Sequence, residues 1–363
     1  MQTVYESEEK RMSRFLGSAY RSLDPYVPGE QPQNQRFIKL NTNENPFPPS
    51  PRVVAAASEE AKRLNLYSDP DLNVFLNPFS SYMKVDREQV FAGNGSDEIL
   101  AIIFQALCED GVIYPDISYG FYKVYAALYN LKSREIPLKE DFTLDPRDYY
   151  NAGATIVIAN PNAPTGIAVT REDIRGILEH NRNNLVVVDE AYVEFGAETV
   201  VPLVKEYDNL LVVGTFSKSR SLAGGRLGYA VSNSGIIEDL NRIKFSINPY
   251  NVNRMTLAAG AASLEDDGYF TECVRTVVQN REYTVNELKK LGFLTTDSSA
   301  NFIFVSHGMI SGGHIYNRLR ENGILVRWFN RPVIKDYLRI TIGSAADMDR
   351  LLKVLKNIVE EEL

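Results

Sequence analysis

Short apolar runs alternate with helix-like patterns through the middle of the chain, from about residue 51 to about residue 247. The runs with the length and composition of buried strands are 91–93, 111–114, 155–159, 185–188 and 210–213. Between them, apolar residues recur at helical spacing, as in the segment 99–107. Alternation of this kind predicts an α/β fold, in which a mostly parallel sheet is covered by helices on both faces.

The pattern changes towards both ends of the chain. Residues 252–290 are periodic and nearly free of Gly and Pro, which indicates helices that link two domains. The elements predicted beyond them are strands at 300–305 and 338–342 and helices at 311–322 and 347–361. We therefore expect an N-terminal arm at 1–45 that packs with the small domain, a large domain at 46–250, and linking helices with a small α+β domain at 251–363.

Composition and charge narrow the class of protein. The chain has 363 residues, of which 44 % are apolar and 24 % charged, and a net charge of −8. An acidic chain lacks the surplus Lys and Arg that hold nucleic acid, so we expect no such partner. Two cysteines and three histidines form neither a disulfide framework nor a metal-binding spacing. Without an apolar run of membrane-spanning length or a signal-peptide pattern, a cytoplasmic location and no membrane contact are expected.

One lysine stands out among hydroxyl and small side chains in the stretch 215–226. Lys218 follows the buried strand predicted at 210–213, and open α/β sheets bind ligands at the carboxyl ends of their strands. Lysine at such a place can form a Schiff base if it is desolvated or lies beside cations. Ser217 and Arg226 can hold a phosphate next to it. Together they indicate a site for pyridoxal 5′-phosphate.

Asp189 ends the apolar run 185–188, so its carboxylate should emerge at the same edge of the sheet. A carboxylate at the end of a buried strand needs a partner, and the protonated ring nitrogen of the cofactor would supply one. Tyr192 lies three residues further and can reach the ring hydroxyl. The alternative for Asp189 is that it caps a helix.

A phosphate-binding turn is predicted at Gly93-Asn94-Gly95-Ser96-Asp97-Glu98, which follows a strand and opens a helix. The residues expected to bind there are Gly95, Ser96 and Asp97, because backbone N–H groups and the helix dipole favour an anion. A dinucleotide fingerprint would need a third glycine where the chain has Glu98, which disfavours a nicotinamide dehydrogenase. Tyr119 follows a strand and can stack on the cofactor ring, or it can be a core aromatic.

Three segments resemble the fold-type-I pyridoxal-phosphate aminotransferases: 160–166 (Asn-Pro-Asn-Ala-Pro-Thr-Gly), 189–192 and 217–226. Within that class the loop 40–46, the turn 95–98 and the strand 338–343 resemble histidinol-phosphate aminotransferases. The match runs from about residue 23 to residue 343. It implies an aspartate-aminotransferase-like fold with a seven-stranded sheet, pyridoxal 5′-phosphate as cofactor, and a homodimer with shared active sites.

The resemblance also implies residue roles. Lys218 would carry the cofactor and move the substrate proton, Asp189 and Tyr192 would bind its ring, and Tyr119 would stack on it. Tyr67 matches a tyrosine that reaches the cofactor phosphate of the neighbouring subunit. The positions that match those binding the anionic group of the substrate are Tyr26, Arg327 and Arg339.

Two positions depart from the pattern of these relatives. They usually carry Asn directly before Pro-Thr-Gly, where this chain has Ala163, and Asn162 is the candidate to take over the contact with the ring hydroxyl. Tyr67 is followed by Ser-Asp-Pro rather than by proline directly, which implies a different setting of its loop.

The expected activity is transamination between histidinol phosphate and 2-oxoglutarate, a reaction of histidine biosynthesis. The resemblance leaves open an aromatic amino acid aminotransferase and a phosphothreonine decarboxylase, because one fold hosts several reactions. A non-catalytic regulator that binds the cofactor is a further alternative. Such a regulator is expected to carry a basic DNA-binding module, and the acidic sequence contains none.

Overall fold

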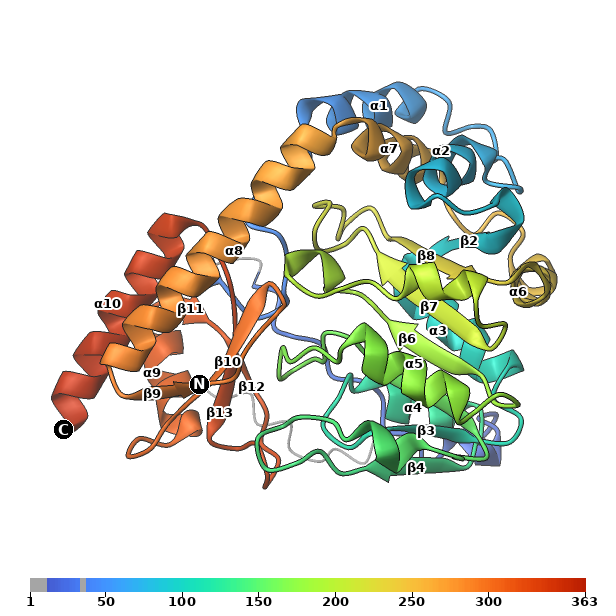
Figure 1. Ribbon diagram of the computed structural model, residues 1–363. Helices are drawn as coiled ribbons and strands as arrows, with labels where there is room; N and C mark the ends of the chain where they lie inside the picture. The colour runs from blue at the N-terminus through green and yellow to red at the C-terminus, as the bar shows by residue number, and fades with distance from the viewer. Residues whose placement is uncertain (1–11, 33–36) are drawn as a thin grey trace.

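The computed structural model describes residues 12–32 and 37–363, which form a larger and a smaller unit (Figure 1). The larger unit contains a seven-stranded sheet in the order β2-β8-β7-β6-β5-β3-β4. Neighbouring strands are parallel from β7 to β4, whereas β8 is antiparallel to both β7 and β2. The bounds are β2 Val90–Asn94, β3 Val112–Pro115, β4 Ser133–Ile136, β5 Thr155–Ala159, β6 Val186–Asp189, β7 Leu210–Thr215 and β8 Leu227–Ser232. The predicted α/β class and mostly parallel sheet are confirmed.

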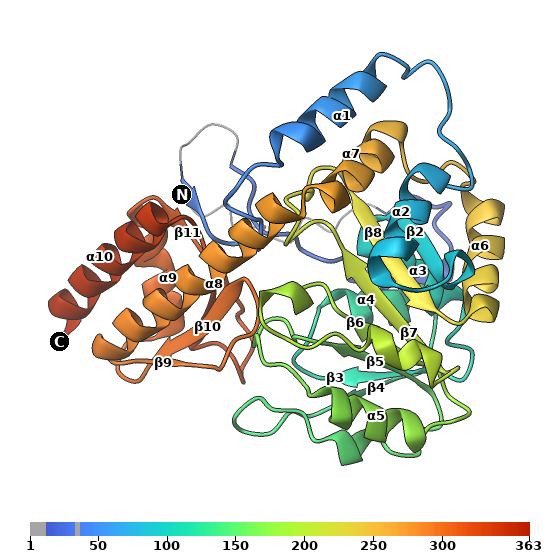
Figure 2. The same ribbon diagram turned by 45° about the horizontal axis from the view of Figure 1, so that its top comes forward.

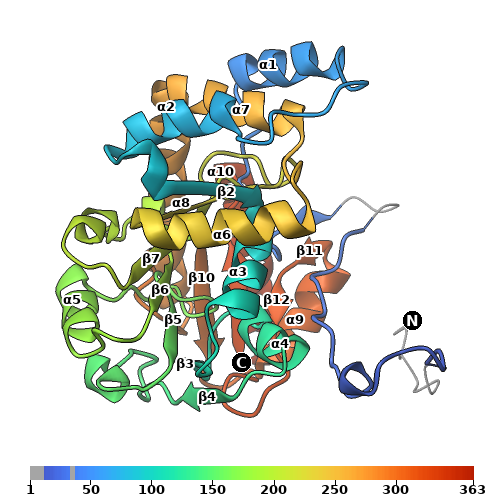
Figure 3. The ribbon, with the colours of Figure 1, turned by 90° about the vertical axis from the view of Figure 1, so that its right-hand side faces the viewer.

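Helices cover both faces of this sheet, and Figure 3 shows the strands between α5 on one side and α3 and α4 on the other. The helices are α1 Pro51–Ala61, α2 Asn73–Met83, α3 Gly95–Ala106, α4 Phe121–Leu128, α5 Arg171–Glu179, α6 Ser234–Ile247 and α7 Arg254–Glu265. In β6, Val186 and Val188 pack in the core formed with α2, α5 and α7, whereas Val187 packs in the core formed with α3, α4 and α6. Successive strand residues alternate between faces, so a continuous apolar run fits a strand buried on both.

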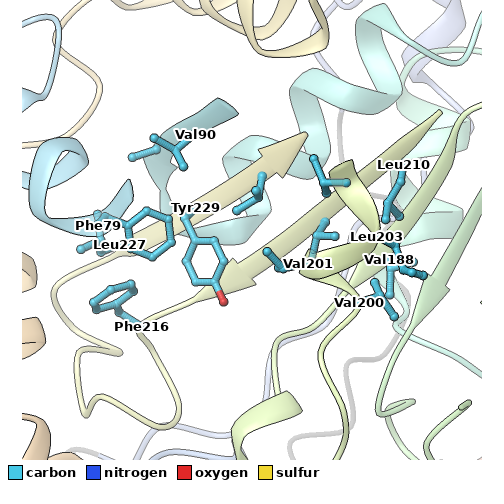
Figure 4. Close-up of a cluster of buried hydrophobic side chains, with 14 of the residues drawn as sticks. Phe79, Val90, Val188, Val200, Val201, Leu203, Leu210, Phe216, Leu227 and Tyr229 are labelled. Atoms are coloured by element: carbon cyan, nitrogen blue, oxygen red, sulfur yellow. The ribbon is translucent and has the colours of Figure 1, made fainter. Parts of the chain in front are cut away.

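Figure 4 shows the first of these two cores. Phe79 from α2 lies there beside Phe216 and Tyr229, which flank the loop 217–226 in sequence. The rings of Phe79 and Tyr229 have centroids 4.6 Å apart. This packing gives the loop after β7 a rigid base.

The smaller unit contains an antiparallel sheet in the order β12-β13-β10-β9. Its elements are β9 Phe293–Thr295, β10 Phe302–His307, β12 Arg327–Trp328, β13 Tyr337–Thr341, α9 Gly312–Glu321 and α10 Ala345–Glu362. A further pair, β1 Ile38–Lys39 with β11 Ile324–Leu325, joins the N-terminal segment to this unit. Part of the expected arm, residues 1–11 and 33–36, lies outside the described residues.

One long helix, α8 Asp267–Lys290, runs from the larger unit to the smaller one (Figures 1 and 2). By contrast α7, which the sequence placed among the linking helices, packs against α1 and α2 of the larger unit. Short 3-10 helices lie at η1 Ser18–Tyr20, η2 Arg87–Gln89, η3 Pro146–Tyr149, η4 Val193–Phe195 and η5 Val201–Lys205. No helix within residues 12–32 and 37–363 has the length and apolar character needed to cross a membrane.

Candidate active site

A cavity of about 450 Å³ lies where the N-terminal segment, the larger unit and the smaller unit meet. Eleven of the residues singled out from the sequence line it: Tyr26, Ser96, Asp97, Tyr119, Asp189, Tyr192, Ser217, Lys218, Arg226, Arg327 and Arg339. They come from the arm, the ends of parallel strands and the smaller sheet. Among the described residues, no group of three His, Cys, Asp or Glu side chains is placed to hold a metal ion.

Lys218 lies in the loop that follows β7. Its Nζ donates a hydrogen bond to the Thr42 carbonyl at 3.1 Å, and its own carbonyl accepts one from Asn45 at 3.0 Å. Burial and, to a lesser extent, the positive charge of Arg339 lower the pKa of Lys218 to about 8. A buried amine with this pKa is partly neutral near neutral pH, which is the form that acts as a nucleophile or a base.

The turn at the start of α3 and the loop before β8 form one polar corner of the cavity. Gly95 has φ +77°, and a Cβ there would lie 2.4 Å from Nη2 of Arg226, so a larger residue would displace the guanidinium. Arg226 Nη2 also contacts Asp97 Oδ2 at 3.0 Å. Ser217 is held by Thr215, whose Oγ1 donates to Ser217 Oγ at 2.9 Å. A helix N-terminus, an arginine and a hydroxyl in one corner suit an anion such as phosphate.

Asp189 is fully enclosed at the end of β6, with 5 % of its surface exposed. Its Oδ2 accepts a hydrogen bond from Tyr122 Oη at 2.8 Å, and its Oδ1 accepts one from Ala191 N at 3.2 Å. Burial raises the pKa of Asp189 to about 6, although these two hydrogen bonds lower it. A cation that entered the cavity beside this carboxylate would favour its ionised form.

Two aromatic residues border the same space. Tyr192 Oη accepts a hydrogen bond from Asn43 Nδ2 at 3.0 Å, and its ring packs edge-on against Phe302 of the smaller sheet. Tyr119 Oη donates to Asp97 Oδ1 at 2.8 Å, which fixes its ring at the cavity wall. Tyr119 lines the cavity and also packs against the core formed with α3, α4 and α6, so its stacking on the cofactor ring stays a prediction.

Two arginines define the end of the cavity nearest the smaller unit. Arg327 donates to the Val27 carbonyl at 2.8 Å and to the Pro28 carbonyl at 3.3 Å. Arg339 Nη2 donates to the Asn41 carbonyl at 2.9 Å, but its buried Nε has no hydrogen-bond partner among the described residues. Tyr26 completes this end and stacks on Phe121 with ring centroids 4.2 Å apart. An orphaned buried N–H of a guanidinium points to an anionic ligand.

Three residues singled out from the sequence lie outside the lining of this cavity. Gly95 lies against Arg226, and the absence of a Cβ leaves room for the guanidinium. Asn162 borders a separate small cavity. Its Nδ2 donates a hydrogen bond to the Ile117 carbonyl at 2.9 Å, and its Oδ1 accepts one from Ser118 Oγ at 2.8 Å. The contact of Asn162 with the cofactor stays a prediction.

Tyr67, the third of these residues, lies on the surface with 80 % of its area exposed. Its ring stacks on Tyr250 at a centroid distance of 4.4 Å. Within one chain it does not reach the cavity.

Sequence reasoning missed several contacts that order the site. Asn43 links Tyr192 to the smaller sheet, because its Oδ1 accepts a hydrogen bond from Thr341 Oγ1 at 3.1 Å. Tyr122, which holds Asp189, follows Tyr119 by three residues and could have been found by its helical spacing. Nothing local in the sequence signals the role of Asn43, since Thr341 lies 298 positions away.

The comparisons with known proteins agree with this geometry. Residues 35–355 match the family model "Aminotransferase class I and II". The histidinol-phosphate aminotransferase of Clostridium botulinum (strain Kyoto / Type A2) is 46 % identical, over 96 % of this chain and 100 % of the relative. That of Acinetobacter baumannii (strain AYE) is 48 % identical, over 94 % of this chain and 97 % of the relative.

A crystal structure of histidinol-phosphate aminotransferase from Sinorhizobium meliloti, in complex with pyridoxal-5′-phosphate, has the same fold as this chain. Its TM-score is 0.88 at 24 % identity, with 97 % of this chain and 99 % of that chain covered. A decarboxylase of L-threonine-O-3-phosphate from Porphyromonas gingivalis also matches, with a TM-score of 0.76 at 21 % identity over 89 % of this chain and 99 % of that chain. The fold alone therefore does not separate these reactions.

Proposed function

Because the chain belongs to the class I and II aminotransferases, we propose that it moves the amino group of histidinol phosphate to 2-oxoglutarate, with pyridoxal 5′-phosphate as cofactor, as a step of histidine biosynthesis. The observation that carries the choice of substrate is the arginine end of the cavity. Arg327 and Arg339 lie there with Tyr26, and the buried Nε of Arg339 lacks a partner among the described residues. The two relatives from Clostridium botulinum and Acinetobacter baumannii are both named histidinol-phosphate aminotransferase.

The residues of the cavity fit each part of the cofactor. Its phosphate would be held by the start of α3 (Gly95, Ser96 and Asp97) with Ser217 and Arg226. Its ring nitrogen would pair with Asp189, and its ring oxygen would accept a hydrogen bond from the Tyr192 hydroxyl. Tyr119 would lie against its ring. Lys218 would be the point of covalent attachment. When bound, pyridoxal 5′-phosphate supplies an electron sink for the bond to the substrate carbon that bears the amine.

The protein's own contribution is to position charges and to move one proton. Lys218 Nζ, with its lowered pKa, is the base that takes the proton from the amine-bearing carbon of the substrate. Arg327 and Arg339 would bind the substrate phosphate as charge-assisted forks and so place that carbon beside Lys218. Residues of the arm and of the smaller unit line the cavity and reduce the access of water to the reacting atoms.

A substrate screen tests this function. We expect the purified protein to use histidinol phosphate with 2-oxoglutarate at a kcat/KM at least about 30-fold above that for histidinol, because the phosphate adds charge-assisted hydrogen bonds. Phenylalanine, tyrosine and phosphothreonine are assayed beside them. Faster turnover of an aromatic amino acid, or release of carbon dioxide from phosphothreonine, would replace the proposal with one of these two activities.

An exposed apolar patch supports the proposal of a homodimer. Its residues lie on neighbouring segments and are between 41 % and 80 % exposed: Leu64, Leu66, Tyr67, Ile247 and Tyr250. Arg254 Nη1 donates to the carbonyls of Leu66 and Tyr67 at 3.2 and 3.1 Å, so the loop that presents the patch is fixed. In this proposal a second copy covers the patch, and Tyr67 reaches the cofactor phosphate in the partner's cavity. The cytoplasmic location stays a prediction.

Hybrid dimers test whether Tyr67 acts in the partner's site. Lys218→Ala and Tyr67→Ala are made separately, each is shown to be impaired, and the two are mixed under conditions that exchange subunits. If Tyr67 acts across the interface, each hybrid has one site lacking both residues and one intact site. Activity should then rise above either parent, towards half of the wild-type value per dimer. Mixing without any gain in activity, or a fully active monomer, would contradict the shared site.

A further inference from the structure

Three tyrosines at three-residue spacing, Tyr119, Tyr122 and Tyr125, lie at the start of α4 and along it. We call them the tyrosine row. Their hydroxyls contact two acidic residues of the cavity, Asp97 and Asp189. Tyr119 Oη donates to Asp97 Oδ1 at 2.8 Å, and Tyr125 Oη donates to the Asp97 carbonyl at 3.0 Å. Tyr122 Oη donates to Asp189 Oδ2 at 2.8 Å. Residues three apart share one face of a helix, so one short helix supports both acidic residues.

The proposed mechanism uses neither Tyr122 nor Tyr125, and Tyr122 is the one of these two that contacts Asp189. It is 0 % exposed, and it lies outside the lining of the cavity. Its ring packs edge-on against Tyr119 at a centroid distance of 5.6 Å and stacks on Phe104 at 6.1 Å. Burial and the nearby Asp189 carboxylate raise the pKa of the Tyr122 phenol well above its usual value, so the hydroxyl keeps its proton and remains a donor. The hydroxyl therefore has one fixed direction, towards Asp189.

The carboxylate of Asp189 is thus held from two sides. Tyr122 donates to one oxygen and the backbone N–H of Ala191 donates to the other, at 2.8 and 3.2 Å. Two donors on different oxygens fix the plane of a carboxylate. Each oxygen also keeps a free acceptor site for a cation that enters the cavity.

We propose that Tyr122 is a positioning residue, which holds the Asp189 carboxylate ionised and correctly oriented for the protonated ring nitrogen of the cofactor. The inference rests on the proposed function, because it assumes that Asp189 meets that nitrogen. Tyr122 touches neither cofactor nor substrate and acts through Asp189 alone. A fully buried carboxylate without such a donor would take up a proton and lose its attraction for a cation.

Substitution Tyr122→Phe removes the hydroxyl and keeps the ring that packs against Tyr119. We expect the dissociation constant of pyridoxal 5′-phosphate for the apoprotein to rise about tenfold or more, as for a lost hydrogen bond to a charged group. The constant is measured by titrating apoprotein and following the visible absorbance of the bound cofactor. Thermal unfolding of the apoprotein checks that the variant is folded.

The matched control is Tyr149→Phe. Tyr149 is also 0 % exposed, but its hydroxyl has no hydrogen-bond partner among the described residues, and it lies in the core on the other face of the sheet. The same chemical change there should leave the dissociation constant within about twofold of wild type. A general response of the protein to losing a buried hydroxyl would affect both variants alike.

The pH dependence of binding separates positioning from packing. The groups that act on Asp189 are Tyr122, the Ala191 N–H, Asp97, which raises its pKa, and Lys218, which lowers it. Loss of the Tyr122 hydrogen bond raises the pKa of Asp189 above its wild-type value of about 6. In Tyr122→Phe the affinity should therefore fall at a higher pH than in wild type as the solution is acidified. A packing defect would lower affinity equally at every pH.

Asp189→Asn makes the two possible failures distinguishable. If Asp189→Asn binds the cofactor as tightly as wild type, Asp189 does not pair with the ring nitrogen, and that part of the proposed function fails. If Asp189→Asn loses affinity while Tyr122→Phe behaves like Tyr149→Phe, the proposed function stands and the role of Tyr122 is overturned. If Asp189 pairs with the ring nitrogen and Tyr122 acts through Asp189, adding Tyr122→Phe to Asp189→Asn causes no further loss of cofactor affinity, because the carboxylate that Tyr122 holds is gone.

Discussion

Replacing Lys218 with alanine is expected to abolish transamination, with kcat reduced by at least about 10⁴-fold. The physical reason is that the side chain combines two tasks at one atom. Nζ lies at the end of β7 in the cavity, and its pKa is lowered to about 8, so it can bond to the cofactor and later accept the substrate proton. Alanine removes both functions, and no other lysine lines the cavity among the described residues.

Borohydride reduction measures the covalent role independently of turnover. The wild-type protein is expected to be yellow, and reduction should fix the cofactor to the peptide that contains Lys218, as seen by mass spectrometry. The variant should lose both the visible absorbance of the lysine-bound form and the labelled peptide. Lys205→Ala, at an exposed residue in η5, is the matched control and should behave as wild type. A reducible cofactor adduct that persists in Lys218→Ala would refute the assignment.

Local patterns predicted five of the seven strands of the larger sheet and missed β4 and β8. The runs that became β6 and β7 are apolar without interruption because both faces of these strands are buried. Strand β8, Leu227–Ser232, escaped detection because Gly228 and Ser232 interrupt its apolar character. Gly228 is there for space, since a Cβ would lie 2.4 Å from the backbone of Gly95. The contact that shapes the polar corner of the cavity thus weakens the strand signal in the sequence.

The residues of the site likewise divide into those that the sequence predicts and those that it does not. Asp189 ends a strand, and Ser96 and Lys218 follow strands within three residues. The rule that ligands bind at the carboxyl ends of strands was therefore enough to bring them together. Tyr122 and Asn43 act through partners 67 and 149 positions away, and such pairings follow from the folded chain rather than from spacing. Asn162 shows the reverse case. It matches a motif within one position, yet its amide bonds Thr165 of its own loop and the Ile117 carbonyl of the loop after β3.

Loss of the Arg339 guanidinium is expected to have the largest effect on substrate recognition. The side chain donates one hydrogen bond to the Asn41 carbonyl, while its buried Nε keeps a donor without a partner among the described residues. Burial lowers the pKa of Arg339, yet a guanidinium does not give up its proton in a protein, so a positive charge without an ion-pair partner among the described residues stays in the cavity. Such a charge is costly unless an anion meets it, and the substrate phosphate would be that anion.

Arg339→Ala should therefore lower kcat/KM for histidinol phosphate roughly 30- to 900-fold, which corresponds to a loss of about 2–4 kcal/mol in transition-state stabilisation. The ratio of kcat/KM between histidinol phosphate and histidinol should fall with it, because the variant no longer favours the phosphate. Arg331→Ala is the matched control, since Arg331 is an exposed arginine of the smaller unit outside the cavity lining. Near-normal efficiency of Arg339→Ala on histidinol phosphate would show that the phosphate binds elsewhere. An equal loss of kcat/KM for histidinol phosphate and histidinol would instead show that Arg339 shapes the cavity and does not bind the phosphate.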